Sequence, residues 1–400
     1  MKPQRIGISW AILPVTGWGI YGYQIIRYMS LKTRFIPVML EDINLDVVDK
    51  LEATVVSRLT EKPLLQQPDG LIPFKNTGKR LPIPILHARG TGVQPQFADH
   101  SLGVIGSHNH ALTFFENANI RKEESETYKR FASVTAGSTW NGEILKNAGV
   151  EKTSVIFQGV DPAQFHPAPK KGLFGDRFVI FAGGKMEYRK GQDIALAALK
   201  IFIERHPETL LLCIWDNQWP HSSAYRQFSN SPHLPSVPAP NARGHLQIDK
   251  WFEIFGLSRK HVYAFTNYPH RETQGLMREA DVALFPNRCE GGTNLVAMET
   301  MACGIPTIIS SNTGHLDIIH EGACIPLKSQ SPVPSPEPGF DTTGWGESSV
   351  EEIVEQLEYV YQNRERAAEI GLRGAQRMHQ LSWDRQVSQL LTFIEDHGLS

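Results

Sequence analysis

Residues 286–306, PNRCEGGTNLVAMETMACGIP, decide the fold of the chain around them. They follow an apolar run at 281–285 that has the composition of a buried strand. Thr293 and Asn294 are residue types that cap helices, and residues 295–303 have a helical pattern that ends in a glycine and a proline. The order is therefore strand, glycine-rich turn and helix, which is the repeating unit of a parallel α/β sheet.

This turn is a predicted anion site. In such a turn, backbone N–H groups and the positive end of the helix dipole point at the same region above the strand. The turn residues expected to hold a diphosphate or a sugar are Gly291, Gly292, Thr293, Asn294 and Leu295. Glu299 lies in the first turns of the helix, where its carboxylate could reach past a phosphate and accept hydrogen bonds from sugar hydroxyls.

The rest of the chain also alternates between strand-like and helix-like segments, so we predict an α/β protein. The predicted elements of the first half include strands at 5–11, 35–40, 83–86, 102–105 and 134–138 and helices at 20–29 and 140–147. Two Pro- and Ser-rich segments, 217–244 and 329–346, are longer than ordinary connections. We expect each to be either a functional lid or a disordered insertion.

The composition fits a globular protein of two domains. The chain has 400 residues, 41% of them hydrophobic, and a net charge of −2, which does not indicate a nucleic-acid-binding protein. The four cysteines show no Cys-x-x-Cys pair, which argues against a zinc site and fits a reducing compartment. No apolar run reaches the roughly 18 residues of a membrane span. We expect a cytoplasmic protein that could also associate with the inner face of the membrane.

The stretch at 286–306 resembles the donor-binding signature of retaining glycosyltransferases of family 4 (glycosyl transferases group 1), which have the GT-B fold. Segment 299–304, Glu-Thr-Met-Ala-Cys-Gly, matches this signature, but eight residues separate Glu290 from Glu299 where the family has seven. Two alternatives stay open. Either the flexible glycine pair 291–292 bulges and restores the position of Glu290, or this carboxylate is displaced.

A second segment, 181–191, is similar to the family's Gly-Arg-x-x-x-x-Lys-Gly pattern at the turn that leaves the first strand of the second domain. Lys185 stands where the family has arginine, and Lys190 stands where it has lysine. Breaking a sugar–diphosphate bond leaves negative charge on the departing phosphate, which fixed cations stabilise in the transition state. The resemblance therefore implies catalytic roles for Lys185, Lys190 and Glu290.

Segment 158–167 is similar to the end of the first domain in this family, and residues 168–175 have the composition of a linker. We therefore expect an acceptor-side Rossmann-like domain at 1–167 and a nucleotide-sugar-binding Rossmann-like domain at 176–381. A C-terminal helix at 382–400 is expected to pack back on the first domain. The GT-B fold implies two doubly wound domains that face each other across a cleft.

Residues 16–22, TGWGIYG, contain the pattern Gly17-x-Gly19-x-x-Gly22 between a strand and a helix. Taken literally, this pattern is the dinucleotide fingerprint of an NAD-dependent dehydrogenase. The lead-in from the strand is longer than the tight turn of that fingerprint. The family-4 glycosyltransferases carry a similar glycine loop, so the resemblance implies that Gly17, Trp18 and Gly19 contact the donor.

The resemblance also implies polar groups from the first domain that face the sugar. His108 and His110 follow the predicted strand at 102–105, and Glu116 occupies the place of a Thr-x-x-Glu segment in some family members. In the second domain, Phe265 lies in a predicted strand that would end beside the nucleotide base.

The predicted activity is the transfer of a sugar from a nucleotide-diphosphate sugar to an unknown acceptor, with retention and without a metal ion or other cofactor. A glycan or a lipid-linked glycan fits the family as the acceptor. The alternatives are a non-catalytic sugar-nucleotide-binding protein, a sugar-nucleotide epimerase or phosphorylase, and the NAD-dependent dehydrogenase.

Overall fold

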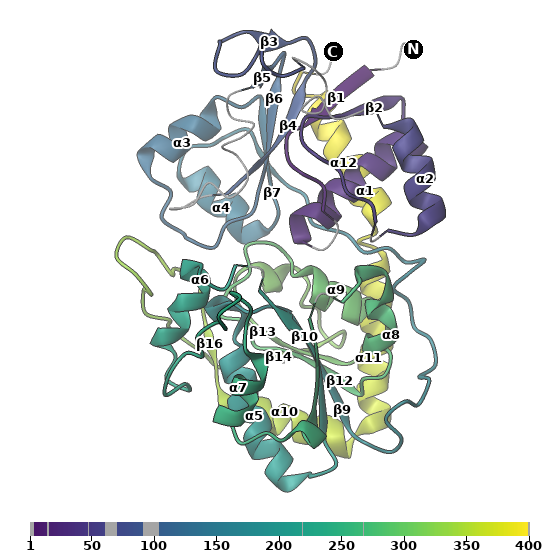
Figure 1. Ribbon diagram of the computed structural model, residues 1–400, viewed down its shortest axis with the longest axis vertical. Coiled ribbons are helices and arrows are strands. Elements are labelled where there is room, and N and C mark those ends of the chain that lie inside the picture. The colour runs from purple at the N-terminus through teal and green to yellow at the C-terminus, as the bar shows by residue number, and fades with distance from the viewer. Residues whose placement is uncertain are drawn as a thin grey trace. The chain divides into compact units, whose positions relative to one another are not determined.

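A computed structural model divides the chain into two compact units, each built around a parallel sheet of six strands (Figure 1). The described residues are 4–13, 16–46, 48–60, 70–90, 104–217, 219–266 and 268–398. The first unit comprises Met1–Gly159, Pro269–Arg271 and Leu381–Ser400, and the second comprises Val160–Tyr268 and Glu272–Gln380. The last helix, α12 (Trp383–Glu395), therefore belongs to the first unit, where it packs on α1 (Gly17–Lys32).

The sheet of the first unit has the strand order β2-β1-β4-β6-β7-β8, and all neighbours are parallel. Its strands are β1 (Gln4–Ile8), β2 (Phe35–Met39), β4 (Ile85–Arg89), β6 (Asn109–Thr113), β7 (Ser133–Ala136) and β8 (Thr153–Val155). The other helices of this unit are α2 (Lys50–Leu59), α3 (Lys122–Lys129) and α4 (Thr139–Asn147). The strand order reverses between β1 and β4, because the chain leaves β1 to one side and later returns to the other.

One strand of the first unit differs from the prediction. Residues 105–106 form only the short strand β5 (Ile105–Gly106), which pairs with β3 (Arg80–Leu81), and residues 102–103 lie outside the described part. The strand of the main sheet is β6, which the sequence analysis did not predict. Two polar residues of β6 each have a polar contact within the sheet: His110 Nδ1 lies 2.8 Å from Ser133 Oγ, and Asn109 Oδ1 lies 2.9 Å from His87 Nε2.

Helix α1 begins at Gly17 and not at residue 20, because Thr16 caps it and its Oγ1 accepts a hydrogen bond of 3.1 Å from Gly19 N. The predicted glycine loop is therefore the first turns of a helix. A Cβ atom at Gly19 would lie 1.7 Å from the carbonyl oxygen of Leu13, and one at Gly22 would lie 2.2 Å from the side chain of Ile12. These two glycines allow close packing of the helix on the chain that precedes it.

The sheet of the second unit has the strand order β11-β10-β9-β12-β13-β14, again parallel throughout. Its strands are β9 (Val179–Lys185), β10 (Leu210–Asp216), β11 (Val262–Phe265), β12 (Val282–Phe285), β13 (Thr307–Ser310) and β14 (Ile325–Leu327). Numbered in chain order this is 3-2-1-4-5-6, the doubly wound order in which ligands bind where the order reverses, here between β9 and β12.

Helices cover the second sheet, and α5 packs with α10 while α9 packs with α11 (Figure 1). The helices are α5 (Gln192–Arg205), α6 (Ser223–Arg226), α7 (Ile248–Ile254), α8 (Thr273–Met277), α9 (Leu295–Ala302), α10 (Val350–Gln362) and α11 (Arg364–His379). Among the described helices of the whole chain, none is both long and apolar enough to cross a membrane.

The two long segments of the second unit are ordered, so the alternative that they are disordered insertions is wrong for their described residues. Tyr225 and Phe228 of the first segment are buried against Trp251, with the Phe228 and Trp251 ring centroids 4.7 Å apart. The second segment is closed by the antiparallel pair β15 (Gln330–Ser331) and β16 (Glu347–Ser348). Apolar burial and strand pairing thus hold both segments in place.

Candidate active site

Two loops meet at the carboxyl ends of β9 and β12, where the strand order of the second unit reverses. Both backbone N–H groups of Arg288 and Cys289 donate to the carbonyl oxygen of Arg189, at 2.7 and 3.1 Å. Gly191 has a φ of 68°, and a Cβ atom there would lie 2.2 Å from the carbonyl oxygen of Pro286. Only glycine fits this contact without strain, which explains why the loops approach so closely.

A cluster of five charged side chains occupies these loops, and we call it the charge cluster. Lys190 Nζ lies 2.5 Å from Glu290 Oε1, and Arg189 Nη1 lies 3.2 Å from Glu290 Oε2. Glu187 accepts from both sides: its Oε2 lies 2.7 Å from Arg189 Nη2, and its Oε1 lies 2.7 Å from Lys185 Nζ. Three cations and two carboxylates leave the cluster with one excess positive charge.

Both carboxylates of the charge cluster are held in their ionised form. Burial opposes the charge of Glu187, but the charges of Arg189 and Lys185 outweigh it and lower its pKa to about 2. Burial also opposes the charge of Glu290, and Lys190 and Arg189 lower its pKa below the ordinary value. At neutral pH both carboxylates are therefore charged. Burial lowers the pKa of Lys190, and the charge of Glu290 opposes this shift.

Glu290 lies inside the charge cluster although eight residues separate it from Glu299. Its backbone N–H donates to Thr313 Oγ1 at 2.9 Å, its carbonyl oxygen accepts from Gly314 N at 3.0 Å, and Asn287 Nδ2 donates to its carboxylate. A Cβ atom at Gly314 would lie 1.8 Å from the carbonyl oxygen of Gly292, so this contact requires a glycine. The carboxylate of Glu290 is thus directed at Lys190 and Arg189.

The turn after β12 ends at Asn294, the N-cap of α9, which has a left-handed backbone with φ of 63°. Its side-chain oxygen faces Ala297 N at 3.4 Å, and its Nδ2 lies 3.0 Å from Nε2 of the buried His315. Nδ1 of His315 lies 3.2 Å from the carbonyl oxygen of Ser310, which can only accept a hydrogen bond. His315 therefore carries its proton on Nδ1, accepts from Asn294 and orients the helix cap.

His315 makes the stability of the protein depend on pH. Burial lowers its folded-state pKa to about 4, below the ordinary 6.5, so the unfolded chain binds more protons between these values. The contribution of His315 to the free energy of unfolding is fully present above pH 6.5 and is lost as the pH falls toward 4. We expect this residue to reduce the free energy of unfolding by about 2 kcal/mol between pH 7 and pH 5.

Urea unfolding of the wild type and of His315→Gln at pH 7 and pH 5 measures this effect. His87 and His110 are also buried with lowered pKa values, so the wild type should lose more than the His315 share alone. The variant should lose about 2 kcal/mol less between the two pH values. An equal loss in both proteins would contradict the assignment.

The remaining predicted residues of the second domain lie at the same edge of the sheet. Gly291, Gly292, Thr293 and Leu295 are buried in the connection from β12 into α9, and Glu299 is buried one turn further along α9. Phe265 is the last residue of β11, and its ring centroid lies 5.2 Å from that of Tyr268. The Nζ atom of Lys185 lies 4.6 Å from the ring centroid of Trp219.

The predicted residues of the first domain do not lie together. Trp18 packs edge-on against Trp10 and Phe114, with centroid distances of 5.9 and 4.9 Å, at the carboxyl end of the first sheet. Glu116 follows β6 at this same end. His108 instead precedes β6 at the opposite end, where it is exposed.

His110 lies within β6 and is 1% exposed, and burial lowers its pKa to about 3. The expectation that His110 follows a strand is therefore wrong, whereas His108 does follow the short strand β5. The start of β6 was not predicted because polar residues, Ser107 and His108, precede it. Of the three predicted acceptor-side residues, only Glu116 follows the carboxyl end of a strand of the six-stranded sheet.

A buried ion-pair network lies next to the charge cluster, where Arg288 Nη1 donates to the carbonyl oxygen of Tyr188 at 2.7 Å. Arg288 has no exposed surface and binds Asp193 with both ends of its guanidinium, at 2.9 and 2.7 Å. Its Nε donates to Glu347 at 2.8 Å, and it also lies over the ring of Tyr188 at 4.0 Å. Although burial opposes its charge, Asp193 raises the pKa of Arg288 above its ordinary value. The sequence analysis missed this network, whose members are up to 154 residues apart.

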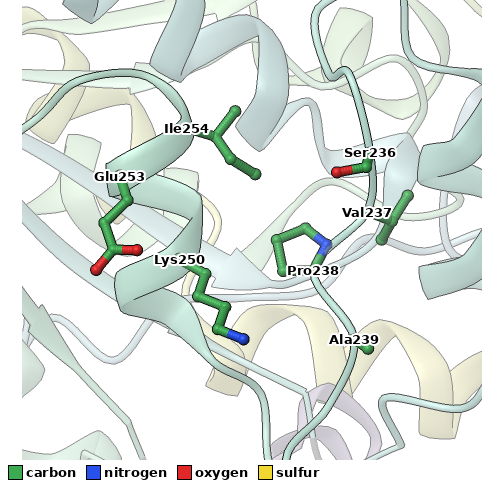
Figure 2. Close-up of a pocket in the computed structure, with 7 residues that line it drawn as sticks. All are labelled: Ser236, Val237, Pro238, Ala239, Lys250, Glu253 and Ile254. Carbon is green, nitrogen blue, oxygen red and sulfur yellow. The ribbon is translucent and has the colours of Figure 1, made fainter.

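No group of three or more metal-ligating side chains occurs within the described residues. A pocket of about 480 Å³ lies between α7 and the segment 236–239 (Figure 2). It is lined by Lys250, Glu253 and Ile254 from α7 and by the side chains of that segment. None of these residues belongs to the charge cluster, so this pocket is separate from the candidate active site.

Two Rossmann-like units with these sheets define a protein of the GT-B fold class. Residues 139–390, more than half of the chain, match the profile of the family described as "Family 4 Glycosyltransferase in conflict systems". The chain belongs to this family of glycosyltransferases.

Similar proteins of known sequence include the spore coat protein SA of Bacillus subtilis, 24% identical over 48% of this chain and 49% of that protein. An uncharacterized glycosyltransferase of Methanocaldococcus jannaschii is 24% identical over 60% of this chain and 56% of that protein. A glycogen synthase of Mycobacterium tuberculosis is 26% identical over 54% of this chain and 44% of that protein. The chain thus matches only about half the length of these relatives.

Two solved structures share the fold over nearly the whole chain. HepE of Anabaena, in complex with UDP and glucose, has a TM-score of 0.65 and 13% identity, covering 98% of this chain and 99% of that one. A sucrose-phosphate synthase of Thermosynechococcus elongatus has a TM-score of 0.65 and 14% identity, covering 98% of each chain. At this identity the similarity concerns the fold alone.

Proposed function

We propose that this protein transfers a sugar from a nucleoside-diphosphate sugar to the hydroxyl group of an acceptor. The charge cluster at the strand reversal of the second unit is the observation that carries the proposal. Its excess positive charge and the N-terminus of α9 suit a diphosphate, which carries negative charge before and after the reaction. Membership of a glycosyltransferase family supports the same activity.

The proposed reaction proceeds with retention and without a metal ion. The bond between the anomeric carbon and the diphosphate oxygen breaks, and the acceptor oxygen bonds to the same face of that carbon. The acceptor's proton passes to a phosphate oxygen of the leaving diphosphate. Lys185, Arg189 and Lys190 supply the positive charge that stabilises this leaving group, which is the task a metal ion would otherwise perform.

Glu290 holds Lys190 in place in this proposal. Its carboxylate lies 2.5 Å from Lys190 Nζ, and the network around Arg288 fixes the loop that carries it. A fixed ammonium group needs no rearrangement when charge develops on the diphosphate, so it is more effective than a mobile surface lysine.

Thermal unfolding in the presence of UDP, GDP, ADP or NAD, without added metal, tests the proposal. The complex of HepE with UDP makes UDP the first candidate. We expect one nucleoside diphosphate to raise the unfolding temperature. A rise with NAD alone would support the dehydrogenase, although Gly17 and Gly19 lie within helix α1. Binding without turnover of any sugar donor would favour a non-catalytic binding protein.

Glu299→Ala is expected to weaken nucleotide binding about tenfold or more, because its carboxylate is proposed to accept hydrogen bonds from the ribose hydroxyls. Isothermal titration with the nucleotide found above measures this change. The matched control is Glu355→Ala, which removes an exposed carboxylate from α10 of the same unit and should bind normally. Equal affinities of the two variants would remove Glu299 from the site.

A further inference from the structure

Some buried polar side-chain atoms in the described part of the first unit have no hydrogen-bond partner. Four of them are Ser9 Oγ, His87 Nδ1, and Nε and Nη1 of Arg89. Ser9 and His87 are 1% and 4% exposed. Unpaired buried polar atoms are rare in native proteins and each one calls for an explanation.

These three residues share one face of the sheet. The register pairs Gly7 with Ile85 in the neighbouring strands β1 and β4, and side chains two residues apart point to the same face. Ser9, His87 and Arg89 therefore lie side by side at the carboxyl ends of these strands. This is the place where the strand order of the first unit reverses, and ligands of doubly wound sheets bind at such points.

Ring contacts confirm that His87 and Arg89 are neighbours. The His87 ring lies 5.6 Å from that of Phe131, and Arg89 Cζ lies 5.9 Å from the same ring. Arg89 Cζ also lies 5.9 Å from the Tyr128 ring, so aromatic rings flank its guanidinium group. Leaving the buried atoms Nε and Nη1 without an acceptor costs free energy.

The protonation of His87 defines what the missing partner must offer. Asn109 Oδ1 accepts from Gly106 N at 2.9 Å, so this atom is an acceptor and His87 Nε2 donates to it at 2.9 Å. In the neutral imidazole, Nδ1 is then an acceptor. The unpaired atoms are thus a pair of N–H donors on Arg89, an acceptor on His87 and a hydroxyl on Ser9.

We propose that the first unit binds its acceptor substrate through an anionic group, a carboxylate or a phosphate, that Arg89 recognises, while His87 accepts a hydrogen bond from a nearby hydroxyl of the same molecule. Arg89 offers two unpaired N–H donors, Nε and Nη1, and guanidinium donors make strong hydrogen bonds to anionic oxygens. The acceptor role rests on the proposed glycosyltransferase function, but the anion site itself does not.

Isothermal titration of the full chain without nucleotide tests the site, with glucose 6-phosphate, glucuronate and glucose as probes. We expect at least one anionic probe to bind at least tenfold more tightly than glucose, and the better of the two identifies phosphate or carboxylate. Arg89→Met should weaken that binding at least tenfold. The matched control is Arg121→Met, which removes an exposed arginine of the same unit that is paired with Glu124 at 3.1 Å.

Stability measurements separate a binding role from a structural one. Because two N–H groups of Arg89 are unpaired, Arg89→Met should unfold at the same temperature as the wild type or higher. Arg89→Lys replaces the guanidinium group by an ammonium group and should bind the anion with intermediate affinity. A lower unfolding temperature of Arg89→Met, equal anion affinities of the Arg89→Met and Arg121→Met variants, or binding of neither anion to the wild type would overturn the proposal.

Nucleotide binding is measured on the same samples. A wild type that binds the anion but no nucleoside diphosphate would refute the proposed function and leave the anion site standing. A wild type that binds a nucleoside diphosphate but neither anion would refute the anion site and leave the proposed function standing.

Discussion

Replacement of Lys190 by alanine is expected to lower kcat/KM for sugar transfer at least about 100-fold, the usual effect of removing one preorganised group that stabilises developing charge. Lys190 lies in the charge cluster, where Glu290 fixes its ammonium group. Lys185→Ala should also lower turnover, by about tenfold or more, because this lysine is paired with Glu187 at the same loop. Steady-state rates with the donor identified by thermal shift measure both effects.

Two variants make the Lys190 result specific. Lys200→Ala removes an exposed lysine from α5 of the same unit and should leave kcat/KM unchanged. Lys190→Arg keeps the positive charge beside Glu290 and should retain more activity than Lys190→Ala. Normal rates in both Lys185→Ala and Lys190→Ala would refute the proposed stabilisation of the leaving group.

Arg288→Met is expected to have the largest effect on stability, a loss of about 3–5 kcal/mol in the free energy of unfolding. Arg288 and Asp193 are both fully buried, and their two side chains share a pair of hydrogen bonds. Removing the arginine leaves the carboxylate of Asp193 in the interior without its counter-ion, which costs more than the intact pair contributes. Urea unfolding of the wild type and the variant at pH 7 measures the loss.

An exposed arginine of the same unit provides the control. Arg205→Met removes a cation that lies 3.4 Å from Glu358 at the surface, and exposed pairs contribute roughly 0–1 kcal/mol. The double variant Arg288→Met with Asp193→Asn removes both charges and should recover part of the stability lost in Arg288→Met. Equal losses in Arg205→Met and Arg288→Met would show that the buried pair is not structural.

Local signals in the sequence predicted much of the second unit. Helix α9 begins after Asn294, as its capping preference indicates, and Gly304 follows its end with a left-handed φ of 81°. The lysines at 185 and 190 leave the first strand of the sheet, as expected from their spacing. Caps, stop signals and turn glycines act within a few residues of each other, so a short window of sequence contains the whole cause.

The first unit was harder to predict because its informative contacts are distant in sequence. Asn109 and His110 look like loop residues, and only their pairing with His87 and Ser133 accounts for their place in a strand. The glycines of the apparent dinucleotide fingerprint serve close packing of α1 on the preceding chain. A pattern of glycines alone does not distinguish a phosphate loop from a tightly packed helix.

The sequence by itself determined the α/β class, the family-4 resemblance and the location of the glycine-rich turn before α9, because periodicity, capping and glycine placement are local properties. Only the tertiary structure decided that Glu290 holds Lys190, that Asp193 neutralises Arg288 and that Arg89 keeps unpaired donors. A charged residue in a sequence gives no sign of its partner, since the partner is selected by the strand order that brings distant loops to one edge of a sheet.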